Sequence, residues 1–150
     1  ALSKRFGRLP MTANETAIRF AYALAPLGFA MWLSHYSFHF FTSYDAAVPV
    51  VQRFAADAGL HGMGEPHWIA SCCRPIGDWL LKLEILFLDF GLLLSLYASY
   101  RIATAHASRM HYAVKAVAPW AALIVLLFAV GVWILFQPMQ MRGTMMEMGG

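Results

Sequence analysis

Apolar residues occur along this chain in three long runs, with polar or mixed stretches between them. The runs cover about residues 17–41, 79–102 and 114–136. A helix rises about 1.5 Å per residue, so each run is long enough to cross the roughly 30 Å hydrocarbon core of a bilayer. Pro26 removes one backbone donor from the first run and predicts a kink there, which neighbouring helices can compensate. The pattern therefore predicts three transmembrane helices.

The long connection 42–78 contains a second kind of pattern. Residues 47–60 place apolar side chains on one side of a helix and Gln52, Arg53 and Asp57 on the other. This predicts an amphipathic helix of about three turns on the membrane surface. The remainder of the connection is rich in Gly and Pro and is expected to be irregular.

The remaining segments are short and polar. Residues 1–14 are a basic lead-in, in which Thr12 or Asn14 can cap the first helix. Residues 103–113 are expected to form a short basic loop, and 137–150 a methionine-rich tail.

Composition supports a membrane protein. Sixty per cent of the residues are hydrophobic and only 13% are charged, against roughly 25% charged in soluble domains. The expected fold class is an all-α integral membrane domain with three transmembrane helices and one amphipathic interfacial helix. Residues 1–150 are expected to form that single domain. Because the sequence starts at Ala1 and not at a methionine, the chain is expected to be a piece of a longer one.

Charge predicts the orientation. Seven Lys and Arg residues fall on the N-terminal side of the predicted topology and four on the other side, where most of the acids also lie. The positive-inside bias then places the N-terminus and the loop 103–113 in the cytoplasm. The connection 42–78 and the tail 137–150 would face the periplasm. The net charge of +3 is modest, and its basic residues are explained by membrane orientation without a nucleic-acid-binding surface. No nucleic-acid partner is therefore expected.

Histidines near the outer end of the first run are the main candidates for chemistry. His35 and His39 are four residues apart and share one helical face, which continues back through Trp32 and Gly28 and could meet other helices. Interhelical hydrogen bonding would also explain the pair. Glu84 in the second run is expected at a similar depth. The pair could ligate a cofactor, bind quinone oxygens or relay protons.

Asp89 is expected near the middle of the bilayer, where an acid is costly and is a functional candidate by default. Asp89 and Glu84 are therefore the candidate catalytic groups, with Asp89 as a proton relay. The alternative for Asp89 is pairing with Lys82 or with a helix outside this sequence, and Lys82 and Glu84 could simply extend to the interface.

The predicted topology collects further metal-ligand residue types on the outer side. These are His67, Cys72, Cys73, Met139 and Met141. Together with His35 and His39 they suit copper, and imidazole also serves haem iron. Ordinary loop cysteines and interfacial methionines are the alternative interpretations. The cofactor is thus left open among quinone, haem and copper.

Three phrases carry a resemblance: APLGFAMWLSHYSFHF (25–40), CCRPIGDWLLKLEILFLDFGLLLSLYASYRIA (72–103) and VWILFQPMQMRGTM (132–145). Over roughly residues 17–145 the chain resembles the C-terminal membrane portion of bacterial membrane-bound polyferredoxin-like proteins of the FesM type, which are akin to the NosR/NapH class. Such proteins carry iron–sulfur clusters on C-x-x-C-x-x-C-x-x-x-C repeats. This sequence has none, so the resemblance implies clusters in an upstream region or a partner protein.

The sequence and this resemblance together predict the membrane module of an electron-transfer assembly in a bacterial inner membrane, with membrane lipid and an iron–sulfur protein as its partners. Two alternatives remain open. One is a copper-handling membrane protein that uses the outer His, Met and Cys residues. The other is a non-catalytic anchor that assembles partners.

Overall fold

A computed structural model describes residues 2–66 and 78–137, and these ranges are helical with no strand. The α-helices and the short 3-10 helices (η) follow one another as α1 (Leu2–Gly7), α2 (Ala13–Ala21), η1 (Tyr22–Leu24), α3 (Ala25–Ser43), η2 (Tyr44–Ala46), α4 (Ala47–Asp57), η3 (His61–Met63), α5 (Trp79–His106) and α6 (Met110–Leu135). The all-α prediction is confirmed for this part of the chain.

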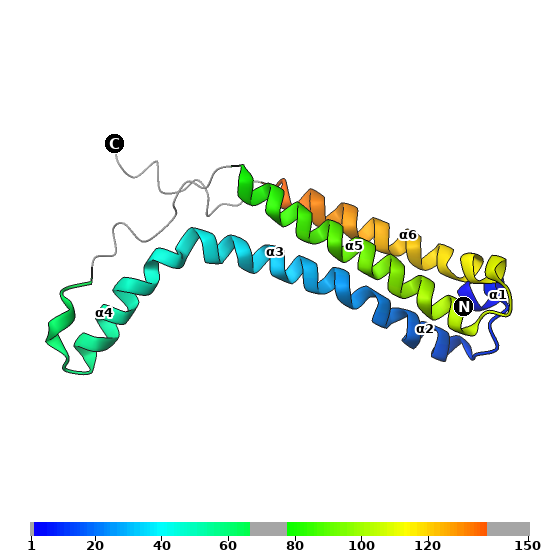
Figure 1. Cartoon of the computed structure of the whole chain (residues 1–150), viewed down its shortest axis with the longest axis horizontal. Helices are drawn as coiled ribbons and strands as arrows, with labels where there is room; N and C mark the ends of the chain where they lie inside the picture. The colour runs from blue at the N-terminus through cyan, green and yellow to red at the C-terminus, as the bar shows by residue number, and fades with distance from the viewer. Residues whose placement is uncertain (1, 67–77, 138–150) are drawn as a thin grey trace.

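Three long helices, α3, α5 and α6, lie side by side (Figure 1). The central one is α5, which packs along both of the others, whereas α3 and α6 touch only slightly. At one end, α1 lies against the start of α6; at the other, α4 continues the line of α3 through η2 and turns away from the bundle (Figure 1). The two ends are called here the basic end (the start of α2 and the α5–α6 turn) and the histidine end (the end of α3 and the start of α5).

The contact between α3 and α5 is built from small residues, most of them four residues apart. On α5 the buried positions include Gly91, Ser95 and Ser99, and on α3 they include Ala30 and Ser34. A Cβ atom built on Gly91 would lie 2.5 Å from the Ala30 Cβ atom, so the two helices approach as closely as their backbones allow. Small residues permit this approach, and the four-residue spacing places them on one face of each helix.

Pro26 lies in the first turn of α3, directly after η1. The Ala25 N–H donates to the Tyr22 carbonyl oxygen, which is the acceptor that an N–H at position 26 would have used. The Leu27 backbone N–H donates across the contact to the Ser95 Oγ atom at 3.0 Å. Two helical turns further along α3, the Ser34 hydroxyl donates to the Glu84 carbonyl oxygen at 2.9 Å. These two bonds fix the register of α3 against α5.

The N-terminal lead-in is more ordered than predicted. Thr12 caps α2, since its Oγ1 atom accepts from the Glu15 N–H at 3.2 Å and the Glu15 carboxylate accepts from the Thr12 N–H at 2.8 Å. Residues 2–7 form α1, and Gly7 lets α1 sit directly on Ala116 of α6. The predicted basic loop 103–113 was also wrong in extent: α5 runs to His106 and α6 begins at Met110, because alanines at both borders favour helix.

The prediction that the face of α3 carrying Gly28 and Trp32 meets other helices was also wrong. Gly28 is exposed with nothing within 4 Å of a Cβ atom built on it, and Trp32 is exposed. The face that packs is rotated from it and carries Leu27, Ala30 and Ser34. A small residue on one helix permits close approach but does not determine which face packs, because the neighbouring helix must also carry small residues at the facing positions.

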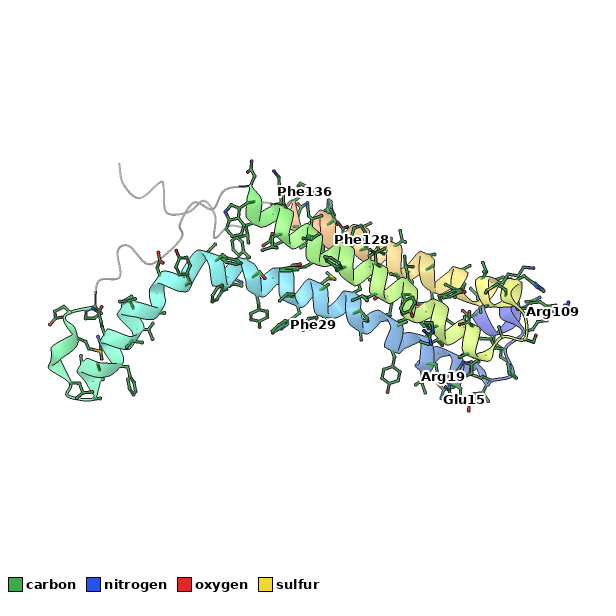
Figure 2. The ribbon with its side chains drawn as sticks, in the orientation of Figure 1. Glu15, Arg19, Phe29, Arg109, Phe128 and Phe136 are labelled. Carbon is green, nitrogen blue, oxygen red and sulfur yellow. The ribbon has the colours of Figure 1, made fainter. Side chains whose placement is uncertain are left out.

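Large apolar side chains cover much of the outside of the bundle. Two described stretches, Ala13–Asp57 and Met110–Leu135, are long and apolar enough to cross a membrane, and only 11% of the most apolar window of the second is buried. Figure 2 shows Phe29 directed away from the neighbouring helices. Helix α5 has a comparable length but carries four charged side chains, Lys82, Glu84, Asp89 and Arg101. The described part of the chain thus has two candidate membrane-crossing stretches held together by a more polar helix.

Candidate functional site

The two candidate histidines meet on one exposed face of α3. The Nε2 atoms of His35 and His39 lie 3.2 Å apart, and the ring planes are nearly perpendicular. His35 is exposed and His39 is half-buried. The i, i+4 spacing places the rings one turn apart on a common face, as the sequence predicted. The hydrogen bond between them requires one Nε2 atom to donate and the other to accept.

Glu84 lies at the same level of the bundle as this pair. Ser34 immediately precedes His35, and its hydroxyl bonds the Glu84 carbonyl oxygen. The Glu84 side chain is only 1% exposed. The common depth predicted for Glu84 and His35 is therefore present. The Glu84 side chain is buried in the helix contact, whereas His35 is exposed on another face of α3, so the carboxyl group and the imidazole pair share a level of the bundle but not a face.

Asp89 belongs to a different environment. Asp89 is exposed and does not lie on the buried face of α5, which carries Glu84 and Leu88. It is five residues further along the helix than Glu84. Lys82 is also exposed, and no ion pair joins it to Asp89 within the described ranges. The structure therefore does not bring Asp89 to the histidine pair. A relay from Asp89 to His35 would need groups from outside residues 2–66 and 78–137.

Five of the predicted metal-ligand residues, His67, Cys72, Cys73, Met139 and Met141, lie outside the described residues. Among the residues that the structure does describe, no group of three or more His, Cys, Asp or Glu side chains is arranged to hold a metal ion. His35 and His39 are therefore a two-ligand element in this part of the chain.

The geometry of that element suits a metal ion. Tetrahedral sites hold imidazole nitrogens at about 2.0–2.1 Å from the metal. Two nitrogens 3.2 Å apart at that radius subtend an angle of about 100° at the metal, close to the tetrahedral angle. Helical i, i+4 histidines are a recurrent pair of ligands for this reason. The pair could thus supply two of four positions without moving apart.

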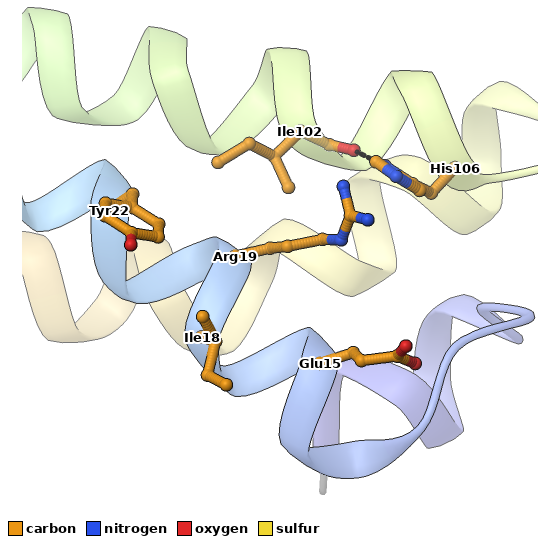
Figure 3. Close-up of a pocket in the computed structure, with 6 residues that line it drawn as sticks. All are labelled: Glu15, Ile18, Arg19, Tyr22, Ile102 and His106. Carbon is orange, nitrogen blue, oxygen red and sulfur yellow. Dashed lines mark hydrogen bonds between the residues drawn. The ribbon is translucent and has the colours of Figure 1, made fainter.

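A groove at the basic end was missed as a candidate site. It lies between α2 and α5 and has a volume of about 560 Å³ (Figure 3). Its lining comprises Glu15, Ile18, Arg19, Tyr22, Ile102 and His106. The signal in the sequence is Arg19 and His106 at the same predicted membrane boundary, but Arg19 counted only toward the charge bias and His106 fell within the predicted basic loop 103–113.

Electrostatics in this groove is dominated by cations. Hydrogen bonds from the Thr12 backbone, and then from its side chain, hold the pKa of Glu15 below its usual value of 4.5, and nearby Arg19 and Lys4 act in the same direction. Glu15 is fully exposed, so these effects are screened by solvent. Its carboxylate is charged at neutral pH and is engaged by the helix cap.

No family model, curated protein or solved structure matches the chain. The assignment of a function to the histidine pair and the groove therefore has to be argued from their own geometry.

Proposed function

We propose that this chain is a membrane module of an electron-transfer assembly, with a metal centre held at the histidine end by His35 and His39. The observation that carries the proposal is the 3.2 Å separation of the two Nε2 atoms on an accessible helix face, at the same level of the bundle as the buried Glu84. A copper or iron ion at this position would supply one-electron chemistry. The histidines hold the ion, and Glu84 provides a nearby proton-binding group.

The membrane placement proposed here has three spans, contained in α2–α3, α5 and α6. It is supported by the two apolar stretches that are long enough to cross a bilayer and by the many large apolar side chains exposed along the bundle. A polar α5 fits as the third span because it is the central helix and its Glu84, Ser95 and Ser99 side chains are buried against its neighbours.

Charge supports the proposed orientation. Within the described ranges the basic end carries seven Lys and Arg side chains and one acid, Glu15. The histidine end, with α4 beyond it, carries Arg53 and Lys82 together with five acids, Asp45, Asp57, Glu65, Asp78 and Glu84. A bacterial inner membrane with the basic end in the cytoplasm satisfies the positive-inside rule. The amphipathic α4 would then lie on the periplasmic surface, with exposed Val51 and Phe54 available to lipid.

The remaining metal positions are proposed to come from the outer loop and tail, among His67, Cys72, Cys73, Met139 and Met141. Their residue types match soft or borderline metals such as copper. Electrons would come from an iron–sulfur protein or domain on the cytoplasmic side, as the resemblance to polyferredoxin-like proteins implies.

Metal content of the full-length chain, purified from membranes, tests the proposal. Replacing both histidines (His35→Ala with His39→Ala) is expected to remove bound copper or iron and the corresponding redox signal in a potentiometric titration. His111→Ala is the matched control, because His111 is an exposed histidine at the opposite end of the bundle. Unchanged metal stoichiometry in the double variant would refute the metal centre.

Copper handling is the second candidate, favoured by the exposure of His35, because an accessible ligand allows exchange with a delivery partner. Truncation after Gln137 separates the two functions. A copper carrier that collects Cu(I) on the methionine tail is expected to lose stoichiometric copper, whereas an electron-transfer centre is expected to retain its redox-active ion. A chain that binds no metal and whose polar span residues tolerate apolar replacement would instead be an anchor.

A further inference from the structure

The groove at the basic end combines cationic and apolar walls. Arg19 reaches from α2 toward α5, where His106 lies, while Tyr22, Ile18 and Ile102 form the side nearer the middle of the bundle (Figure 3). Tyr22 is 74% exposed and Ile18 is 51% exposed. A ligand for this groove therefore needs an anionic part and an apolar part.

Arg19 is the principal anion-binding group in the groove. Among the residues that the structure describes, its guanidinium has no hydrogen-bond or ion-pair partner. The one acid in the groove, Glu15, attracts Arg19 electrostatically but forms no ion pair with it in the described part of the chain, and its carboxylate accepts hydrogen bonds from the Thr12 N–H and Oγ1 at 2.8 and 2.9 Å. A guanidinium fork binds phosphate oxygens in a bidentate manner.

His106 provides a second polar group on the opposite wall. Its Nδ1–H donates to the Ile102 carbonyl oxygen at 2.8 Å, which holds the ring in place. In neutral histidine the Nε2 atom then carries a lone pair, which can accept a hydrogen bond from a hydroxyl group of the headgroup, such as a glycerol hydroxyl, but not from a phosphate oxygen. The surrounding charge favours an anion as well, since Lys4 lies close enough to act on Glu15 and the whole end has seven cationic side chains against one acid. Such basic pockets between helices suit lipid headgroups.

The position along the helices selects a lipid over a soluble anion. Ile18 lies one turn beyond Glu15, and Tyr22 lies one turn beyond Arg19, in each case toward the apolar part of the bundle. The cationic and apolar walls therefore succeed each other along the proposed membrane normal. Tyrosine is a typical residue of the membrane–water boundary. This order matches a phospholipid whose phosphate meets Arg19 and whose acyl chain continues along Tyr22 and Ile18.

We propose that the groove between α2 and α5 is a binding site for the phosphodiester headgroup of an anionic phospholipid, with Arg19 as its bidentate ligand and His106 as a second contact. The proposal rests on the membrane placement proposed above and is independent of the histidine-end metal centre. Metal content therefore reports on one proposal and lipid binding on the other.

Native mass spectrometry of the detergent-solubilised full chain tests the site, with phosphatidylglycerol, phosphatidylcholine of the same acyl chains and inorganic phosphate as probes. Phosphatidylglycerol is expected to bind at least about tenfold more tightly than phosphatidylcholine. Arg19→Gln is expected to reduce that preference about tenfold, the size of one lost charge-assisted contact. Arg109→Gln is the matched control: Arg109 is exposed at the same end but does not line the groove (Figure 2), so this variant should keep the preference.

Two results would overturn the lipid site. Equal losses in the Arg19 and Arg109 variants would mean that the general charge of the basic end attracts the lipid. Inorganic phosphate that competes with phosphatidylglycerol at equal concentration would mean that the groove binds a soluble anion. His106→Gln is a second test, because it removes the imidazole contact without changing the formal charge of neutral histidine. It is expected to weaken the preference for phosphatidylglycerol over phosphatidylcholine by several-fold. Extraction of the chain from membranes by alkaline carbonate would refute the membrane placement itself.

Discussion

Replacing Gly91 by alanine is the sharpest test of how α3 and α5 are held together. The added Cβ atom would lie 2.5 Å from the Ala30 Cβ atom and 3.1 Å from the Leu27 Cα atom. None of these atoms is the end of a flexible side chain, so the helices themselves must separate. Gly28→Ala is the matched control on the same helix pair, because it places a methyl group where nothing lies within 4 Å.

The two variants should differ by a predictable amount. Alanine favours a helix over glycine by about 1 kcal/mol, and this gain applies at both positions. Overpacking of a tight contact costs about 1–3 kcal/mol, and this cost applies only at Gly91. Gly28→Ala is therefore expected to raise the free energy of unfolding by about 1 kcal/mol, and Gly91→Ala to lie about 1–3 kcal/mol below it.

Unfolding of the purified full chain by SDS in mixed micelles, followed by tryptophan fluorescence, measures this difference. Gly131→Ala provides an intermediate case, since its nearest neighbour is the flexible Met31 Cε atom at 3.4 Å; it should behave like Gly28→Ala. A Gly91→Ala variant at least as stable as Gly28→Ala would show that the close contact between α3 and α5 does not exist.

The remaining predictions concern hydrogen bonds made by side chains. Ser95→Ala leaves the Leu27 N–H without its acceptor and is expected to cost about 1–2 kcal/mol of stability in the same SDS titration. Its control is Ser99→Ala, which removes a buried hydroxyl that has no hydrogen-bond partner among the described residues and should be neutral or stabilising. The hydrogen bonds from Thr12 lower the pKa of Glu15, so the α2 cap contributes stability above pH 4.5 that is lost as the pH falls through the lowered pKa. NMR titration of the Glu15 carboxyl should show Thr12→Ala moving its midpoint upward, and an unchanged midpoint would contradict the capping box.

The fold could be predicted from the sequence as far as helix type and approximate length are set by local pattern. The Thr12 cap and the run of α6 follow from residues close in sequence, and so does the meeting of His35 with His39. The choice of packing face on α3 could not be predicted in this way. It depends on Gly91 and Ser95, which lie more than 60 residues later in the chain.

The candidate sites show the same division. The histidine pair is a local feature of one helix, and so it was visible in the pattern. The groove at the basic end joins Arg19 to His106 across two helices, and its polar residues are individually ordinary for a membrane boundary. Asp89 was expected to matter because of its depth, but its exposure on α5 is a property of how the helices are rotated, which depth alone does not determine.

The central position of α5 has a consequence for how the domain is assembled during synthesis. In the proposed membrane placement, α3 would enter the bilayer before the residues that complete it exist, so the Leu27 amide and the Ser34 hydroxyl would wait for α5 to arrive. Helices α5 and α6 are separated only by residues 107–109 and would insert together as a hairpin. Helix α1 precedes all of them in the chain, yet its contact with Ala116 would form last. Docking of α1 would therefore mark the completed domain, and protection of Gly7 and its neighbours from proteolysis would report when insertion has finished.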